Sequence, residues 1–598
     1  MCPNEAKSSK SVFPSSTRRG GAKRRGGAVQ KIVFVGRTAP PLRGTPPWPR
    51  RGKVRRIDLQ TGIVSTIAGL VQGSEDGVGS AGRLNAPTDI WSDGTTLYIV
   101  DSGNNKIRKL IPVKPPDPTT TTNPGDITYR ITDRGGVSRV TSGGDATKVG
   151  YARILPTGSS NTPSGMAIFG FRQSGTLVSE AAVPASPLIR SGRIYAEIGG
   201  GVNTGVAIAN PNGAAATISF YYTDANGVNQ LTGSTSVAAN GQVAAFLDQA
   251  PFLTNESFRP SLGTFRTFTF TSSIPIAVVA LRGLTNERSE FLITTLPVTS
   301  IDQSSTTAVS FPHFTDGGGW KTQVVLVNPA DSSINGSVQF FSQGSATTAG
   351  AATTMTANGT TASTFTYVIP ARSSFKLESA GTDPGVKAGS VKVTPAGGSV
   401  APSGLVVFSY RSNGVTVSEA GVAALPPASA SRLYAEVSGD FNSSAVGAIQ
   451  TGFAISNPSA SNVTVNFEIT TLDGVSTGLT GSTTVPASGQ TAMFLNQIQG
   501  FGSLPNPFQG VLRITGANVF VTGLRGRYNE RGNFLITTTA PIDETAAAST
   551  TEMVFPHLAD GGGYTTQFIL FSGNAGSTSN GLLRFFSQSG GALGLTLR

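Results

Sequence analysis

The chain has 598 residues, enough for several domains, and only 13% of them are charged, while glycine alone contributes 74. This composition, rich also in Ser, Thr, Ala and Val, disfavours long helices and favours strands joined by tight turns. The single cysteine, Cys2, excludes an intramolecular disulfide framework and zinc sites built on several thiolates. We therefore predict an all-β chain stabilised by sheet pairing and packed cores.

The first 53 residues hold much of the formal net charge of +12, in Arg/Gly and Pro-rich stretches such as RRGGAKRRGGA. Such a composition predicts a disordered basic segment over 1–53. Flexible Arg/Gly segments bind nucleic acid electrostatically, but no folded nucleic-acid motif follows, so we predict no specific nucleic-acid partner. KIVFVG at 31–36 is too short for the apolar core of a signal peptide, and no apolar run is long enough to predict a transmembrane segment.

Residues 54–111 predict five short strands separated by Gly-, Asp- and Asn-containing turns. Asn-Ala-Pro at 85–87, Asp-Gly at 93–94 and Leu-Tyr-Ile-Val-Asp at 97–101 resemble the NHL repeat of β-propellers. The resemblance implies one propeller blade, in a family whose members bind protein, RNA or small ligands or act as lyase- or lactonase-like enzymes. Propellers need about 4 to 8 blades, so this blade is either the end of a larger propeller or a unit that pairs with another chain.

A Pro/Thr-rich segment at 112–126 predicts an extended linker, and after it the chain repeats itself. GMAIFGFRQSGTLVSEAAV, from residue 165, returns as GLVVFSYRSNGVTVSEAGV, from residue 404. A weaker half-length repeat, in which an alternating strand ends in Asn-Pro, recurs at a spacing typical of an immunoglobulin-like sandwich. We predict complete sandwiches at 191–308, 309–430 and 431–552, a partial sandwich at 127–190 and a truncated one at 553–598.

The two incomplete sandwiches have two explanations. We favour the explanation that the natural chain ends at a damaged gene boundary, because both incomplete sandwiches stop abruptly. Alternatively, the half-modules complement each other between molecules by donating strands to an open sheet edge.

Both histidines lie in a repeated phrase, FPHFTDGGGW and FPHLADGGGY. Metal binding needs three or four converging ligands, and no third ligand repeats near His313 or His557. In the alternate modules Glu197 and Glu436 align with these histidines, which favours a strand end leading into a glycine loop. We predict no catalytic, metal-binding or cofactor-binding residues. The possible ligand contacts are Trp320, Tyr564, His313 and His557.

Other repeated polar residues also favour structural roles. Four arginines near the ends of apolar strands are aligned as one equivalent structural position: Arg172, Arg282, Arg411 and Arg525. Asn-Glu-Arg at 286–288 and 529–531 predicts a hairpin tip with a solvated ion pair or, alternatively, a carbohydrate-contacting loop. Glu180 and Glu419 sit in VSEA, without the second carboxylate that glycoside hydrolysis requires.

The repeats from 127 to 598, with their Asn-Pro strand ends and FPH phrase, are similar to those of large surface or exported proteins of soil bacteria. This resemblance implies an extracellular or cell-surface location, although no signal peptide is visible. We predict a non-enzymatic adhesin, stalk or scaffold whose partner is a protein or glycan at a surface. The alternatives are a carbohydrate-binding accessory array, or a fragment of an NHL-propeller enzyme or binding protein.

Overall fold

The computed structural model describes residues 30–34, 54–58, 64–68, 72–76, 83–92, 97–110 and 126–598, except residues 145, 303, 574 and 575. The chain divides into two compact units, Met1–Thr119 and Thr120–Arg598. Helical elements in the described residues are short 3-10 turns: η2 (Ser102–Asn104), η3 (Glu256–Thr264) and η4 (Leu495–Gln497). The remaining elements are strands, which confirms the all-β prediction.

The described residues of the first unit form two antiparallel three-stranded sheets, β1-β2-β3 and β4-β5-β6. Their strands are β1 (Gln30–Phe34), β2 (Val54–Asp58), β3 (Val64–Ala68), β4 (Pro87–Ser92), β5 (Leu97–Asp101) and β6 (Lys106–Leu110). The buried carboxylate of Asp101 accepts hydrogen bonds from the Asn85 backbone (2.6 Å) and the Asn104 side chain (2.8 Å), so it fixes the turn after β5. The NHL resemblance stays a prediction.

The prediction of disorder over 1–53 is wrong for one short stretch. QKIVF, at residues 30–34, forms β1 and pairs antiparallel with β2. Its apolar β-branched residues favour a strand within an otherwise Gly- and Pro-rich segment. The rest of 1–53, and nearly all of the predicted linker at 112–126, lie outside the described residues.

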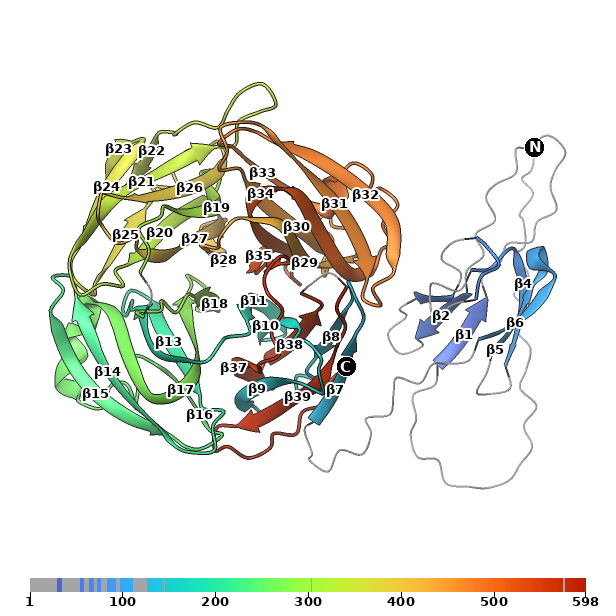
Figure 1. The fold of residues 1–598 in the computed structure, drawn as a ribbon, viewed down its shortest axis with the longest axis horizontal. Helices are drawn as coiled ribbons and strands as arrows, with labels where there is room; N and C mark the ends of the chain where they lie inside the picture. The colour runs from blue at the N-terminus through green and yellow to red at the C-terminus, as the bar shows by residue number, and fades with distance from the viewer. Residues whose placement is uncertain are drawn as a thin grey trace, which may run out of the picture. The chain divides into compact units, whose positions relative to one another are not determined.

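The second unit is a ring of four β-sandwiches around a common centre (Figure 1). We call them sandwich I (189–296), sandwich II (309–423), sandwich III (428–543) and sandwich IV (126–184 with 553–587). Each contains two sheets in which four strands follow the same order, and in sandwich III a short fifth strand pairs with the edge of one sheet. We call the interface between two neighbouring sandwiches a seam.

Sandwiches I and III share one plan, in which a single long strand runs through both sheets. In sandwich I the sheets are β15-β14-β17-β12 and β16-β13-β17-β18, and in sandwich III they are β32-β31-β34-β29 and β33-β30-β34-β35. The strands of sandwich I are β12 (Ile189–Tyr195), β13 (Val202–Ala209), β14 (Ala216–Asp224), β15 (Asn229–Val237), β16 (Gln242–Phe246), β17 (Phe265–Thr285) and β18 (Phe291–Leu296). Those of sandwich III are β29 (Ala428–Ser438), β30 (Ile449–Ser456), β31 (Val463–Thr471), β32 (Ser476–Val485), β33 (Gln490–Phe494), β34 (Phe508–Tyr528), β35 (Phe534–Thr539) and β36 (Ile542–Asp543).

Sandwiches II and IV divide that long strand into two. The sheets of sandwich II are β19-β26-β21-β24 and β25-β20-β27-β28, and those of sandwich IV are β37-β9-β39-β7 and β8-β38-β10-β11. The strands of sandwich II are β19 (Val309–Asp316), β20 (Trp320–Val327), β21 (Ile334–Ser342), β22 (Met355–Ala357), β23 (Thr360–Ala362), β24 (Thr364–Ile369), β25 (Ser374–Glu378), β26 (Lys387–Pro395), β27 (Ser403–Ser412) and β28 (Val415–Ala423). Those of sandwich IV are β7 (Asp126–Ile131), β8 (Gly136–Val140), β9 (Lys148–Pro156), β10 (Ser164–Gln173), β11 (Thr176–Pro184), β37 (Met553–Asp560), β38 (Tyr564–Phe571) and β39 (Ser579–Ser587).

Alternating side chains explain how each sandwich buries its core. In β14, Ile218, Phe220 and Tyr222 are buried, while the intervening Thr217 and Ser219 are exposed. This period of two places the apolar residues between the two sheets and the hydroxyl residues on the outer face. The cores also continue across the seams, since Val325 and Leu405 of sandwich II pack into the core of sandwich I.

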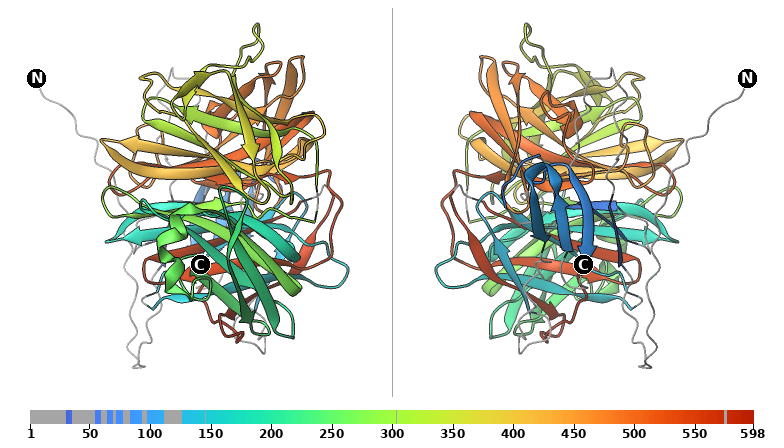
Figure 2. Two further views of the ribbon diagram at one scale, coloured as in Figure 1. Left: turned by 90° about the vertical axis from the view of Figure 1, so that its left-hand side faces the viewer. Right: turned by 90° about the vertical axis from the view of Figure 1, so that its right-hand side faces the viewer.

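Sandwich IV is built from both ends of the ring-forming unit. Strand β10 pairs with β38 along its length, and β9 lies between β37 and β39. Figure 2 shows the red C-terminal strands beside the cyan strands of residues 126–184. The expectation of two separate incomplete sandwiches is therefore wrong, because each segment supplies the strands that the other lacks, and this complementation occurs within one molecule.

Candidate functional site

One edge strand from each sandwich meets its neighbours at the centre of the ring: β11, β18, β28 and β35 (Figure 1). Serine hydroxyls join them in two equivalent places. Ser179 Oγ on β11 accepts a hydrogen bond from the Ile293 backbone on β18 (2.8 Å), and Ser418 Oγ on β28 accepts one from Ile536 on β35 (2.8 Å). The centre thus has a twofold repeat that relates sandwiches I and II to sandwiches III and IV.

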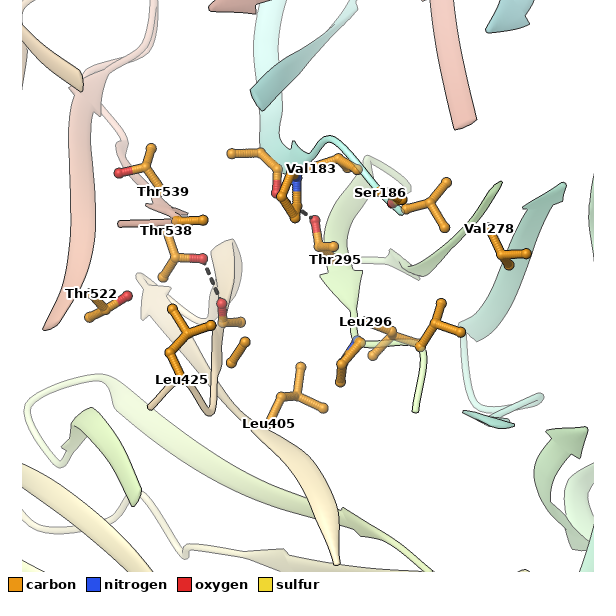
Figure 3. A pocket seen from close by; sticks show the side chains of 18 of the residues that line it. Val183, Ser186, Val278, Thr295, Leu296, Leu405, Leu425, Thr522, Thr538 and Thr539 are labelled. Atoms are coloured by element: carbon orange, nitrogen blue, oxygen red, sulfur yellow. Dashed lines mark hydrogen bonds between the residues drawn. The ribbon is translucent and has the colours of Figure 1, made fainter. Parts of the chain in front are cut away.

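Threonine hydroxyls extend these contacts along the central strands. Thr295 Oγ1 donates to the Ala182 carbonyl (2.9 Å), and Thr538 Oγ1 donates to the Gly421 carbonyl (2.5 Å), as the dashed lines in Figure 3 mark. The four residues come from four different sandwiches. Both of these donors are already used, whereas the neighbouring hydroxyl, Thr539 Oγ1, is buried without a hydrogen-bond partner.

These residues form part of the wall of a pocket of about 340 Å³, which we call the axial pocket. All four sandwiches contribute to its lining, which includes Leu296, Leu405 and Leu425 (Figure 3). Prolines stand at the strand ends here, Pro184 as the last residue of β11 and Pro297 directly after β18, and they have no backbone N–H to offer. Among the described lining residues none carries a charge, so the pocket is predominantly apolar.

Buried ion pairs hold two of the four seams near the centre. Arg525 of sandwich III contacts Glu180 of sandwich IV and also binds Glu436 (3.2 Å). Burial alone would lower the pKa of Arg525, but the carboxylates of Glu180 and Glu436 raise it above its ordinary value. The buried guanidinium therefore stays charged and balanced by carboxylates from two sandwiches.

The equivalent pair lies at the seam between sandwiches I and II. Arg282 contacts Glu419 and binds Glu197 (3.3 Å), and Glu197 also binds Lys376 (2.7 Å). Burial opposes the charge on Arg282, but Glu419 and Glu197 raise its pKa above the ordinary value. The carboxylates in the VSEA phrases thus serve as ion-pair partners of a neighbouring sandwich.

The alignment of four equivalent arginines is wrong by three residues. In sandwich I, Arg282 on β17 pairs with Thr204 on β13. The counterpart of Thr204 in sandwich II is Thr322 on β20, and it pairs with Phe408 on β27. Arg411 follows Phe408 by three positions and forms an exposed pair with Glu287 (3.2 Å). The arginines therefore belong to two structural sets, one buried and one at the surface.

The Asn-Glu-Arg hairpin tips lie between β17 and β18 and between β34 and β35, but their predicted solvated pairs do not form. Glu287 instead binds Arg411 and accepts a hydrogen bond from the Thr416 backbone (2.8 Å), both in sandwich II. Glu530 makes the corresponding contact with Arg172 of sandwich IV (2.6 Å). Each of these two glutamates therefore links its own sandwich to a neighbouring one.

The two histidines lie at the other two seams, where His313 is buried and His557 is partly buried. Gln490 of sandwich III donates to His313 Nδ1 (3.1 Å), and Gln242 of sandwich I donates to His557 Nδ1 (3.0 Å). The other ring nitrogen of His313 lies 3.0 Å from Thr315 Oγ1. Burial lowers the pKa of both histidines to about 4, so they are neutral imidazoles at pH 7.

The alignment of Glu197 with a histidine is also wrong. The Glu197 backbone donates to Thr204 Oγ1 (3.0 Å) in the way that the Thr315 backbone donates to Thr322 Oγ1 (3.3 Å). Two residues before these positions stand Tyr195 and His313. The histidine of one module type is therefore matched by a buried tyrosine in the other.

Trp320 and Tyr564 are half-buried in equivalent aromatic clusters at the histidine seams. The Trp320 ring lies on Tyr410 (4.6 Å between centroids), and Tyr564 stacks on Phe171 (4.5 Å). Across the seam between sandwiches II and III, Trp320 also contacts Phe534 edge-on (6.4 Å). Each ring thus has one face packed within its own sandwich, which leaves limited area for a ligand.

Sequence reasoning missed the residues of the axial pocket. Thr295 and Thr538 lie in the phrase FLITT, which occurs at 291–295 and again at 534–538 and carries no polar signature of a site. Among the described residues, no group of three or more His, Cys, Asp or Glu side chains could hold a metal ion. No helix in the described part of the chain is long and apolar enough to cross a membrane.

Comparison with known proteins gives no family. No family model matches the chain, and no curated protein matches it. One solved structure, titled "Crystal structure of the T13 IBDV viral particle reveals a missing link in icosahedral viruses evolution", is 10% identical. The alignment covers 78% of this chain and 81% of that one, with a TM-score of 0.09, and a likeness this weak carries no argument about fold or function.

Proposed function

We propose that the chain is a non-enzymatic binding protein of the cell surface or extracellular space, in which the ring acts as a rigid scaffold or adhesin. The observation that supports this role is that the charged groups near the centre form ion pairs between neighbouring sandwiches. Arg282, Glu419, Arg525 and Glu180 are buried in cross-seam ion pairs. A carboxylate held in this way is neither a free general base nor a nucleophile.

Closure of the ring distinguishes a scaffold from a stalk. A stalk gains reach with every module added in line, whereas sandwich IV here combines strands from residues 126–184 and 553–587. A closed arrangement instead presents four sandwiches at fixed mutual positions, which favours several simultaneous contacts with one surface. Of the predicted roles, scaffold and adhesin therefore have more support than stalk.

The test is solid-phase binding of the full chain to a panel of immobilised polysaccharides and surface proteins. Saturable binding, with the bound ligand recovered chemically unchanged by mass spectrometry, is the expected result. Cleavage or modification of a ligand at a catalytic rate would overturn the proposal. Loss of turnover in a variant of a central carboxylate would then locate the chemistry.

Carbohydrate binding is a second candidate, and the recurrence of the aromatic clusters at two seams favours it. Trp320 and Tyr564 are each partly exposed beside further aromatic rings. Aromatic faces offer large apolar contact area at low entropic cost. If these clusters bind sugars, Trp320→Ala and Tyr564→Ala will each weaken binding on a glycan array, and the double variant will abolish it, whereas unchanged binding excludes both clusters.

A further inference from the structure

The axial pocket is a cavity whose lining matches one class of ligand. It offers about 340 Å³ between the ends of the central strands and is partly open to solvent, and its described lining residues include no charged side chain. Moving an ion from water into this lining is unfavourable, because no opposite charge is present to compensate the lost hydration. Charged ligands are therefore disfavoured by the lining itself.

Two hydroxyls of the pocket wall are already used in hydrogen bonds between strands, whereas Thr539 Oγ1 is buried without a partner. The hydroxyls of Thr295 and Thr538 already donate to the carbonyls of Ala182 and Gly421. The prolines Pro184 and Pro297 have no backbone donor. A buried water needs about two to four polar partners to be held, so a water bound to the Thr539 hydroxyl alone is displaced at little cost.

The size of the pocket sets the scale of the ligand. Dry apolar cavities of about 150 Å³ bind benzene, and small-molecule pockets begin at about 300 Å³. The axial pocket, at about 340 Å³, has room for a molecule larger than one aromatic ring. Its four walls come from four sandwiches, so the pocket exists only while the ring is closed.

We propose that the axial pocket binds a neutral, predominantly apolar small molecule at the centre of the ring. This site is separate from the aromatic clusters at the seams, and it adds a second kind of ligand to the proposed binding role. A ligand here contacts all four sandwiches, including Leu296 of sandwich I and Leu405 of sandwich II. Occupancy therefore stabilises the closed ring by mass action.

The experiment compares two fluorescent probes that share one aromatic framework. N-phenyl-1-naphthylamine is neutral, and 8-anilinonaphthalene-1-sulfonate carries a sulfonate. In titrations of the full chain, the neutral probe is expected to bind saturably with one site and the anion at least tenfold more weakly. Equal affinity for the two probes would overturn the proposal, because it would mean nonspecific adsorption to apolar surface.

Pocket-filling variants locate the bound probe. Ala423→Trp and Ala540→Trp fill the pocket from sandwich II and from the segment after β35, and Ala225→Trp at the exposed turn between β14 and β15 is the matched control. Each filling variant is expected to weaken binding of the neutral probe at least tenfold, with the control unchanged. Probe binding that survives both fillings, in variants that retain the wild-type melting temperature, would overturn the proposal.

The same variants keep the two proposals distinguishable. Binding to immobilised polysaccharides or surface proteins is measured in parallel on wild type, Ala423→Trp and Ala225→Trp. Loss of probe binding with surface binding intact supports an axial site that is independent of the scaffold role. Probe binding with no surface ligand found would leave the axial site standing and count against the scaffold role.

Discussion

The side-chain amide of Gln490 donates a hydrogen bond to Nδ1 of His313 across the seam between sandwiches II and III (3.1 Å). Gln242 and His557 repeat this relationship between sandwiches I and IV (3.0 Å). Both imidazoles must be neutral to accept these bonds, because a protonated ring has no acceptor nitrogen. The repeated FPH phrase therefore has a defined role, because its histidines join the half of the ring formed by sandwiches I and II to the half formed by sandwiches III and IV.

Replacing Gln490 by alanine is expected to destabilise the ring by about 1 to 3 kcal/mol, because it leaves the buried Nδ1 of His313 without a donor. Chemical denaturation measures the loss as a change in the free energy of unfolding. The matched control is Gln343→Ala, since Gln343 is exposed and binds the same Gln490 side chain (3.1 Å). A loss in the control as large as that in Gln490→Ala would contradict the role assigned to the imidazole.

Acid is expected to weaken the histidine seams. Burial lowers the pKa of His313 and His557 to about 4 in the folded ring, whereas the unfolded chain has the ordinary value of about 6.5. As the pH falls, the histidines of the unfolded state therefore bind protons at a higher pH than those of the folded ring. The contribution of the neutral histidines to the free energy of unfolding is fully present above pH 6.5 and is lost as the pH falls toward 4. It amounts to about 3 kcal/mol per histidine.

The measurement is the free energy of unfolding between pH 7.5 and pH 4.5. Wild type is compared with the double variant His313→Gln/His557→Gln, in which the seam residues do not titrate. Carboxylates such as Glu290 also affect stability in acid, but they are common to both proteins and cancel in the comparison. Parallel pH profiles for the two proteins would show that the histidines are not the acid-sensitive groups.

Local patterns in the sequence predicted the strands and the repeat, because alternating apolar residues report directly on the two faces of a sheet. They failed where the argument depended on register. The sequence similarity around Arg282 and Arg411 aligns them wrongly, because a longer hairpin tip follows Arg282. The strand pairing of Thr204 and Thr322 reveals the three-residue offset between the two arginines. Ring closure was missed for a similar reason, because pairing between β10 and β38 spans most of the chain and leaves no local signal.

The buried and exposed arginines give a direct test of that register. Arg525→Met leaves Glu180 and Glu436 without their guanidinium, and breaking a buried pair costs about 3 to 5 kcal/mol. Arg172→Met removes a pair with Glu530 in which both side chains are more than a third exposed, so its cost is below about 1 kcal/mol. Urea denaturation of the two variants measures the difference, and equal losses would mean that the two arginines are equivalent after all.

The last prediction concerns ring closure by sandwich IV. Without residues 553–598, strands β9 and β10 lose their pairing with β37, β38 and β39, and the apolar side chains of Ala167 and Phe169 lose their cover from Phe568. Unpaired strand edges beside exposed apolar surface promote association. A chain ending at residue 552 is therefore expected to associate or to melt at a lower temperature than the full chain.

Adding residues 553–598 as a separate peptide tests whether the lost strands alone are responsible. The peptide is expected to bind the shortened chain with one-to-one stoichiometry, to restore a monomer by light scattering, and to raise the melting temperature. A peptide in which Phe568 and Leu570 are replaced by aspartate is the control, because both side chains are buried in the core of sandwich IV. If the shortened chain is monomeric and melts like the full chain, closure through sandwich IV does not stabilise the ring.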